Sequence, residues 1–219
     1  MPEPLSVAMV TGGLAGLAVK YARTRYALLK DAFDVTVSIL LLLAALPVMA
    51  ICAAIIKLSD PRGPVLFTQT RVGLGGKRFL MYKLRTMYTD AEKDTGAVWA
   101  ADDDPRVIPL CRFMRLSHLD ELPQLYNILR GDMSLVGPRP ERPEIIRELM
   151  MHIPNYLDRL EVKPGLTGLA QIENGYDSDI DSARRKVAWD LEYVRTRGWA
   201  TDMKILGRTI LMITGKGAR

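Results

Sequence analysis

The sequence predicts an α+β protein that is mostly helical, with a re-entrant membrane helix and a compact cytosolic domain carrying a small β-hairpin and amphipathic surface helices. Three observations lead to this fold class. A long uncharged apolar segment lies near the N-terminus, two strand-like segments around a Gly-rich turn follow it, and the rest shows helical periodicity between Pro and Gly residues. The 219 residues suffice for one domain of ordinary size with an appendage.

The apolar segment runs from Val35 to Ile56 without a charged residue. About 20 apolar residues span the core of a bilayer, so we expect this segment to be embedded in the membrane. Pro47 lies near its middle and should kink or break the helix. Basic residues flank both ends, and positive flanks favour the cytoplasm. We therefore predict a re-entrant helix that bends at Pro47. A plain spanning helix is the alternative, because spanning helices tolerate proline.

These features divide the chain into three parts. Residues 1–29 form an N-terminal extension that can lie on the membrane, residues 30–58 form the re-entrant helix broken near Pro47, and residues 59–219 form the cytosolic domain with the candidate site. Within this domain the hairpin strands are expected in residues 65–73 and 78–87. Amphipathic helices are expected at three places: Pro143–Ile153, Arg184–Gly198 and Asp202–Ile213.

Composition excludes several classes of function. The formal net charge of +5 suits nucleic acid, phosphorylated ligands or an anionic membrane surface. The basic residues are interleaved with acidic ones and no recognition motif is present, so nucleic acid is not expected as a partner. Two cysteines and two histidines give neither a disulfide framework nor a zinc site, which favours a reducing, cytosol-facing location.

The stretch LSHLDELPQLYNIL contains two adjacent carboxylates, Asp120 and Glu121, shortly before Pro123. Because proline is tolerated only in the first turn of a helix, a helix should begin near Asp120 and end at Gly131. Aspartate is a preferred N-cap, and a glutamate in the first turn complements the helix dipole. On this interpretation alone, the pair is a helix start.

The neighbouring residues favour a site as well. Arg139 stands between two prolines in GPRP, and Arg115 precedes Asp120 by five residues. Arginine offers a fork of donors suited to phosphate, and a helix N-terminus also favours anions. Carboxylates beside phosphate-binding groups indicate a divalent cation, and Mg²⁺ prefers oxygen ligands. We therefore expect Asp120, Glu121 and the two arginines to converge on a phosphate and Mg²⁺.

Five segments in this order give a resemblance to a known family: an apolar segment with a central proline, FTQTRVG, KLRTM, LSHLDELPQLYNILRGDMSLVGPRP and KPGLTGLAQI. Together they resemble the bacterial sugar transferases, the small monotopic phosphoglycosyl transferases. The resemblance covers roughly Lys30 to Ile213. One departure concerns the residue before the central proline, which is often serine in the family and is Leu46 here. Serine can satisfy backbone groups freed by a proline, so its absence affects the expected bend geometry.

The resemblance implies transfer of a sugar 1-phosphate from a UDP-sugar to polyprenyl (undecaprenyl) phosphate, with release of UMP. It implies that Asp120 is the nucleophile, that Glu121 is its partner, and that Mg²⁺ is held at this pair. Arg115 and Arg139 match arginines that engage phosphate. Three further residues match a region near the nucleotide: Lys163, Pro164 and Gly165. The apolar segment matches a helix that enters the inner membrane from the cytoplasm without crossing it.

Two other functional classes remain open on the sequence. A membrane-bound Mg²⁺-dependent phosphohydrolase of a nucleotide sugar or lipid diphosphate would use the same carboxylates and arginines with water as acceptor. A non-catalytic membrane adaptor would bind anionic lipid or a partner through its basic surface. The sequence does not identify the sugar, the glycan pathway or the oligomeric state, for which a homodimer is one option.

Overall fold

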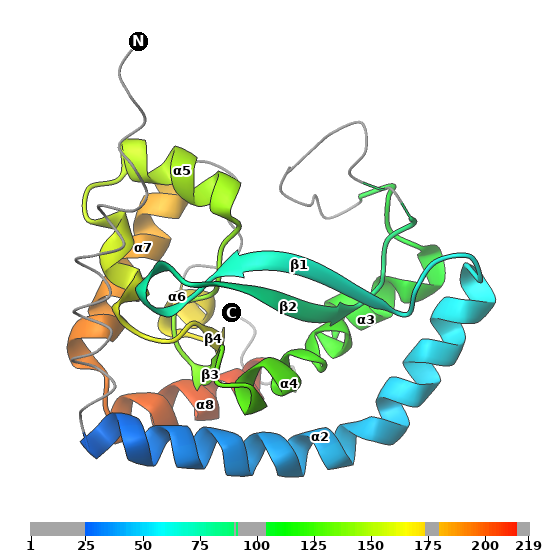
Figure 1. Cartoon of the computed structure of the whole chain (residues 1–219), viewed down its shortest axis with the longest axis horizontal. Helices are drawn as coiled ribbons and strands as arrows, with labels where there is room; N and C mark the ends of the chain where they lie inside the picture. Colours follow the sequence, from blue (N-terminus) through cyan, green and yellow to red (C-terminus); the bar gives the residue numbers. More distant parts are fainter. Residues whose placement is uncertain (1–24, 90, 92–103, 174–179, 214–219) are drawn as a thin grey trace.

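The computed structural model describes residues 25–89, 91, 104–173 and 180–213. Most of these residues are helical, and two small two-stranded sheets complete the fold, as the predicted fold class requires (Figure 1). The α-helices are α2 (Arg25–Ser59), α3 (Arg112–Leu116), α4 (Gln124–Leu129), α5 (Pro143–His152), α6 (Leu169–Glu173), α7 (Ile180–Thr196) and α8 (Trp199–Ile213). The 3-10 turns are η1 (Leu74–Gly76), η2 (Pro109–Cys111), η3 (Leu119–Glu121) and η4 (Tyr156–Glu161). The strands are β1 (Leu66–Val72), β2 (Arg78–Leu84), β3 (Ser134–Val136) and β4 (Gly165–Thr167).

α2 is the apolar segment of the sequence, and it extends beyond both of its predicted ends. The helix continues through Pro47 without interruption, so the predicted break is not present. Figure 1 shows instead that the ribbon changes direction where its colour passes from blue to cyan. By length and composition α2 is able to cross a membrane, with a mean hydropathy of 2.9 over its most apolar 18-residue window. Only 17% of that window is buried, which distinguishes α2 from the core helix of a soluble protein.

The inner face of α2 is part of the protein core. Its buried residues recur at intervals of three, four or seven positions, as one face of a helix requires. They are Ala27, Lys30, Asp34, Ser38, Ala45, Cys52 and Ile56. Polar contacts join this face to distant parts of the chain: the Lys30 ammonium lies 2.9 Å from the Asp202 carboxylate, and the Ser134 hydroxyl donates to Asp34 over 2.6 Å. α2 is therefore attached to both α8 and β3.

The predicted hairpin is confirmed. β1 and β2 pair antiparallel, with Leu66 opposite Leu84 and Val72 opposite Arg78. The chain reverses through the 3-10 turn η1, where Gly75 and Gly76 have φ angles of 62° and 80°. Such angles favour glycine, which explains the Gly-rich turn in the sequence.

β3 and β4 form a second, parallel pair that the sequence analysis did not predict. Ser134 lies opposite Gly165, and Val136 lies opposite Thr167. The pair brings the GPRP segment after β3 beside the KPGLTG segment that contains β4, although the two are about 30 residues apart in the sequence. This pairing sets the position of Arg139.

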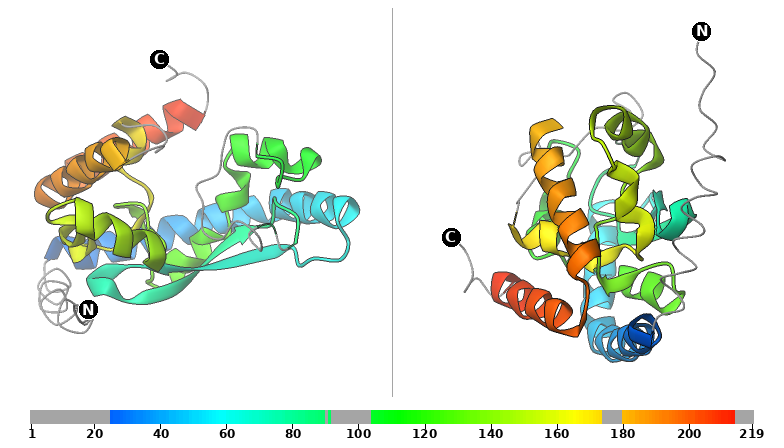
Figure 2. Two further views of the ribbon diagram at one scale, coloured as in Figure 1. Left: turned by 90° about the horizontal axis from the view of Figure 1, so that it is seen from above. Right: turned by 90° about the vertical axis from the view of Figure 1, so that its left-hand side faces the viewer.

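The three amphipathic helices of the C-terminal half correspond to α5, α7 and α8. α7 begins at Ile180, earlier than the predicted start at Arg184. Figures 1 and 2 show α8 along the same edge of the molecule as α2. The two helices meet at their N-terminal ends, where the Trp199 ring packs edge-on against Phe33.

Candidate active site

The stretch around Asp120 folds as a 3-10 turn followed by a short α-helix. The chain enters through His118, whose φ of 56° lies in the left-handed region, and then forms η3 and α4. Pro123 stands directly before α4, where its missing N–H removes no hydrogen bond of the helix. Gly131, with a φ of 78°, ends the segment as predicted. The predicted single helix is thus two consecutive helical pieces.

The prediction that Asp120 caps this helix is wrong. The residue at the N-cap of η3 is His118, and no side chain makes a capping hydrogen bond there. Backbone carbonyls accept the hydrogen bonds instead: the Glu121 N–H donates to His118 over 3.1 Å and the Leu122 N–H to Leu119 over 3.3 Å. The tight 3-10 turn satisfies these donors itself, so the Asp120 carboxylate is not used for capping.

Glu121 is held by two cations from different parts of the chain. Lys83, near the end of β2, donates to its Oε1 over 2.8 Å, and Arg139 donates to both of its carboxylate oxygens. Burial alone would raise the pKa of Glu121, but Arg139 and Lys83 hold that pKa well below its ordinary value. The arginine predicted to bind phosphate therefore also fixes the partner carboxylate, and Glu121 stays ionised.

Asp120 has a different environment from its neighbour. It is 6% exposed, and its carboxylate makes no hydrogen bond or ion pair with any other residue that the structure describes. Burial raises the pKa of Asp120, and the positive charges of Lys83, Arg115 and His118 act against that rise. The adjacent carboxylates thus differ: two cations bind Glu121, and no described donor binds Asp120.

The GPRP segment is held in place by the KPGLTG segment. The Gly137 N–H donates to the Thr167 carbonyl, and the Gly165 N–H donates to the Pro138 carbonyl, each over 2.9 Å. The two backbones approach so closely that a Cβ atom on Gly165 would lie 2.1 Å from the Gly137 nitrogen. Arg139 follows directly, with its side chain 30% exposed beside Glu121, so the guanidinium remains accessible to a phosphate.

The other residues predicted for the site have structural contacts of their own. The Lys163 ammonium pairs with Asp31 of α2 over 2.9 Å, and the Pro164 carbonyl accepts from the Ser134 N–H over 2.8 Å. These contacts anchor KPGLTG, and its proposed contact with the nucleotide stays a prediction. Arg115 lies close enough to lower the pKa of Asp120, and its guanidinium is 3.5 Å from the Thr86 hydroxyl. It is therefore placed to add charge to the site.

Lys83 is a site residue that the sequence reasoning missed. In the sequence it is one of several basic residues of the hairpin segment, and the sequence analysis assigns it no role. The signal that could have identified it is its place in KLRTM, but its proximity to Glu121 depends on α4 packing against β2. The Asn127 amide of α4 bonds this strand directly, accepting from the Tyr82 N–H over 3.1 Å and donating to the Leu80 carbonyl over 2.7 Å.

The carboxylates at this site fit part of the predicted Mg²⁺ environment. Within the described chain, no group of three or more His, Cys, Asp or Glu side chains could hold a metal ion. Mg²⁺ is often bound by one or two carboxylates together with substrate phosphates. Asp120 offers such a carboxylate, whereas both Glu121 oxygens already accept hydrogen bonds from cations. The donor set therefore fits a cation that Asp120 and a substrate diphosphate hold together.

A groove of about 480 Å³ lies elsewhere, between α6, α7 and α8. Its wall includes Trp189, Lys204 and Arg208, and none of the predicted site residues lines it. The carboxylate pair and this groove are therefore at different places in the molecule.

Comparison with known proteins agrees with the motifs. The family described as "Bacterial sugar transferase" matches residues 25–216. A UDP-N-acetylgalactosamine-undecaprenyl-phosphate N-acetylgalactosaminephosphotransferase of Aeromonas hydrophila is 40% identical over 89% of this chain and 46% of its own length. An undecaprenyl-phosphate glucose phosphotransferase of Komagataeibacter xylinus is 45% identical over 83% of this chain and 35% of its own length. An exopolysaccharide production protein of Rhizobium leguminosarum bv. phaseoli is 39% identical over 86% of this chain and 98% of its own length. The chain thus spans less than half of the first two relatives and nearly all of the third.

Proposed function

Because the chain belongs to the bacterial sugar transferase family, as its motifs predicted, we propose that it transfers a sugar 1-phosphate from a UDP-sugar to undecaprenyl phosphate. The products are UMP and an undecaprenyl diphosphate-sugar, formed in the first membrane step of glycoconjugate or exopolysaccharide synthesis. Relatives named for transfer to undecaprenyl phosphate and for exopolysaccharide production support this proposal. Their names include both glucose and N-acetylgalactosamine, so the sugar of this chain is left open.

The observation that carries the proposal is the division of labour between the two adjacent carboxylates. A nucleophile needs a lone pair that no protein donor occupies, and Asp120 has no described hydrogen-bond donor. Glu121 is occupied by Lys83 and Arg139, which lowers its pKa and with it its basicity. This difference supports Asp120 as the attacking residue and Glu121 as the residue that holds the two cations in place.

The reaction proceeds in two displacements at one phosphorus atom. An oxygen of Asp120 attacks the β-phosphorus of the UDP-sugar, a new O–P bond forms, and the bond to the UMP oxygen breaks, so that UMP leaves with the electron pair. The aspartyl phosphosugar is then attacked by a phosphate oxygen of undecaprenyl phosphate, and the carboxylate of Asp120 leaves. Covalent carboxyl phosphates of this kind are known intermediates in phosphoryl transfer, and ping-pong kinetics are expected.

The cations around Glu121 supply the electrostatic part of the mechanism. Lys83 of β2, Arg115 of α3 and Arg139 of the GPRP segment would offset the negative charge of the transferring group. Mg²⁺, when bound at Asp120 with the diphosphate, would add further charge neutralisation. The contact of Lys163, Pro164 and Gly165 with the nucleotide is part of the proposal.

The membrane helix has a role in this scheme because one substrate is a lipid whose phosphate stays at the bilayer surface. We propose that α2 enters the inner membrane from the cytoplasm and returns to the same side, with the rest of the chain facing the cytoplasm. The exposed apolar face of α2 and the basic residues at both of its ends support this arrangement.

The test measures UMP release by the full chain in a membrane mimetic with Mg²⁺, undecaprenyl phosphate and a panel of UDP-sugars. We expect multiple turnovers with at least one UDP-sugar, and a loss of at least about 1000-fold in Asp120→Asn, in the range seen for removal of nucleophiles. Asp181→Asn, an exposed aspartate of α7, is the matched control and should retain wild-type turnover. Full turnover by Asp120→Asn would contradict the covalent mechanism.

Omitting the lipid acceptor separates the proposal from its rivals. A transferase with a covalent intermediate releases about one UMP per enzyme and leaves a phosphosugar on Asp120, which mass spectrometry of the intact protein can detect. A phosphohydrolase continues to turn over because water is its acceptor. A non-catalytic adaptor releases no UMP under either condition.

A further inference from the structure

Residues 137–141, the GPRP segment and Glu141, form a loop beside Glu121. Three consecutive backbone carbonyls of this loop accept hydrogen bonds from outside it. The Arg139 carbonyl accepts from the Arg159 guanidinium over 2.7 Å, and the Pro140 carbonyl accepts from Arg71 over 3.1 Å. The Glu141 carbonyl accepts from the Val72 N–H over 3.0 Å. The backbone on both sides of the Arg139 side chain is therefore fixed by donors that lie outside the carboxylate pair.

The sequence of the loop explains why side chains are needed for this purpose. Pro138 and Pro140 have no N–H, so the segment cannot form a continuous backbone ladder with a neighbouring strand. Its carbonyls are the groups by which the surrounding protein can hold it. A guanidinium can reach such a carbonyl from a distant element and donate in a defined direction.

Arg159 is unusual because it is a fully buried arginine remote from the carboxylate pair. It is 2% exposed, and Asp190 of α7 accepts from its Nε over 2.8 Å and from its Nη2 over 2.6 Å. The Tyr156 ring lies beside the guanidinium, whose carbon is 5.4 Å from the ring centroid. Burying an ion pair is costly, and apolar residues of similar size often stabilise a core as well. Packing alone therefore gives no reason for a charged pair here.

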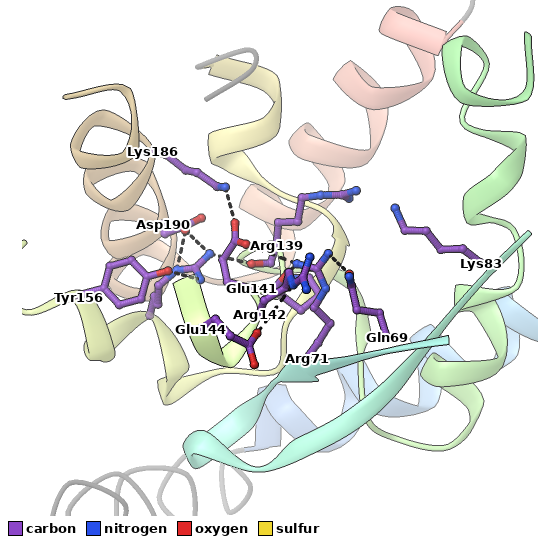
Figure 3. A network of polar contacts seen from close by, with 12 residues as sticks. Gln69, Arg71, Lys83, Arg139, Glu141, Arg142, Glu144, Tyr156, Lys186 and Asp190 are labelled. Carbon is purple, nitrogen blue, oxygen red and sulfur yellow. Dashed lines mark hydrogen bonds and ion pairs between the residues drawn. The ribbon is translucent and has the colours of Figure 1, made fainter. Parts of the chain in front are cut away.

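A second group of charged residues, centred on Glu141, also supports the loop (Figure 3). Glu141 lies between Lys186 of α7, at 2.7 Å, and Arg71 of β1, at 3.4 Å. Burial by itself would raise the pKa of Glu141, but Lys186, Arg159 and Arg71 lower it to about 2. Figure 3 shows the Arg139 side chain extending from this network toward Lys83. Arg139 thus contacts Arg159 through its backbone carbonyl and Glu121 through its guanidinium.

We propose that Arg159, oriented by Asp190, is a positioning residue that fixes the backbone of Arg139 and thereby directs the Arg139 guanidinium to Glu121 and to the phosphate transferred at Asp120. This inference rests on the proposed function. It assigns α7 a part in the reaction, although α7 contributes no side chain to the carboxylate pair. The requirement is for the fork geometry of the guanidinium and not for positive charge alone, because Nε and Nη2 of Arg159 both bind Asp190 while Nη2 also donates to the Arg139 carbonyl.

The test is a double-mutant cycle with Arg159→Lys and Arg139→Lys, measured as kcat and KM for UMP release. Arg159→Lys keeps the charge and loses the fork, and we expect kcat to fall about 10- to 100-fold with little change in KM, as for a small misplacement of a catalytic group. In the Arg139→Lys background the same change should lower kcat less than about twofold further, since the group it positions is already gone.

Arg85→Lys is the matched control. Arg85 is also buried, pairs with Asp60 and donates to the Pro64 carbonyl over 2.6 Å, but it makes none of the described contacts with residues 137–141. Its effect on kcat should be the same in both backgrounds. Equal effects of Arg159→Lys in both backgrounds would overturn the inference. Asp190→Asn, which keeps the volume and loses the charge, provides a second cycle if Arg159→Lys does not fold, and it must show the same dependence on Arg139.

A measurement that does not need activity separates this inference from the proposed function. Hydrogen–deuterium exchange of the peptide covering residues 134–142 should be faster in Arg159→Lys than in the wild type, and unchanged in Arg85→Lys. Unchanged exchange in Arg159→Lys would contradict the positioning role even if turnover fell. A wild type that released no UMP would contradict the proposed function, while the exchange data would still decide whether Arg159 holds the loop.

Discussion

At the scale of single residues, the adjacent carboxylates differ because of what surrounds them and not because of their own chemistry. Burial acts on both, but only Glu121 has cations within hydrogen-bond distance. The pKa of Asp120 is therefore raised and that of Glu121 is lowered. A pair that is one residue apart in the sequence is thus divided into a basic, open group and an occupied one.

A second residue-scale contrast occurs on α4, between two buried amides. Gln124 and Asn127 are both 0% exposed, but both amide atoms of Gln124 lack a hydrogen-bond partner among the described residues, whereas those of Asn127 bond to β2. An unpaired buried polar group costs about 1–3 kcal/mol. We predict that Gln124→Met raises the free energy of unfolding by about 1 kcal/mol or more, and that Asn127→Leu lowers it by about 2 kcal/mol or more.

The measurement is the thermal unfolding midpoint of each variant in the same membrane mimetic. The two changes remove an amide from neighbouring positions of one short helix, so each serves as the control for the other. A lower midpoint for Gln124→Met would show that the Gln124 amide is hydrogen-bonded in the folded protein.

The sequence identified some residues of the site and missed others for a physical reason. Asp120, Glu121 and Arg139 lie within 20 residues of each other, and their residue types and the prolines around them carry the chemistry directly. Lys83 reaches Glu121 from β2, and Arg159 reaches the backbone of Arg139 from η4. Their roles depend on tertiary packing, and an isolated Lys or Arg in a basic protein carries no signal of it.

At the scale of elements, the pairing of β3 with β4 depends on the absence of side chains at Gly137 and Gly165. We predict that Gly165→Ala destabilises the protein by roughly 3 kcal/mol or more, because the added Cβ would lie 2.1–2.5 Å from backbone atoms of Gly137 and Thr167, which cannot move aside. Gly207→Ala is the control. A Cβ at Gly207 of α8 meets nothing within 4 Å, and alanine there should stabilise the helix by roughly 0.5–1 kcal/mol.

Unfolding midpoints of the two glycine variants decide between close packing and a general intolerance of the fold to alanine. Equal midpoints would show that close backbone packing around Gly165 does not limit stability. Since the GPRP segment is held by its contacts with Gly165 and Thr167, UMP release should fall with Gly165→Ala and not with Gly207→Ala.

Elements with strong periodicity were predicted well, and those with none were missed. The hairpin follows from strand-like residues around a Gly-rich turn, and helices α5, α7 and α8 follow from apolar residues at helical spacing. β3 and β4 have three residues each and pair with partners about 30 positions away, so no local pattern indicates them. The 3-10 turn at Asp120 replaced a predicted α-helical cap because the left-handed His118 turns the chain before the helix begins.

At the scale of the whole molecule, the two faces of α2 have opposite characters. Exposed leucines such as Leu40 and Leu43 cover the outer face, while Lys30 and Asp34 lie on the buried face. A spanning helix and a re-entrant one differ in where their ends lie. We predict that both ends of α2 face the cytoplasm, so single cysteines in place of Arg25 and Arg62 should both be inaccessible to a membrane-impermeant maleimide in intact cells.

Permeabilised cells provide the comparison, and both positions should then react, since both arginines are exposed. The unsubstituted chain is the background control, because its own Cys52 and Cys111 are buried. Labelling of one position but not the other in intact cells would favour the spanning alternative.

The buried face of α2 also limits how this protein can be engineered. A fragment that begins after Ser59 would expose Leu125 and Ile128, which pack in one cluster with residues of α2, and would leave Asp202 without Lys30 and Ser134 without Asp34. A soluble version is therefore better sought by substituting polar residues for the exposed leucines of α2 than by truncation. One helix thus provides both an exposed apolar face and part of the core of the remaining chain.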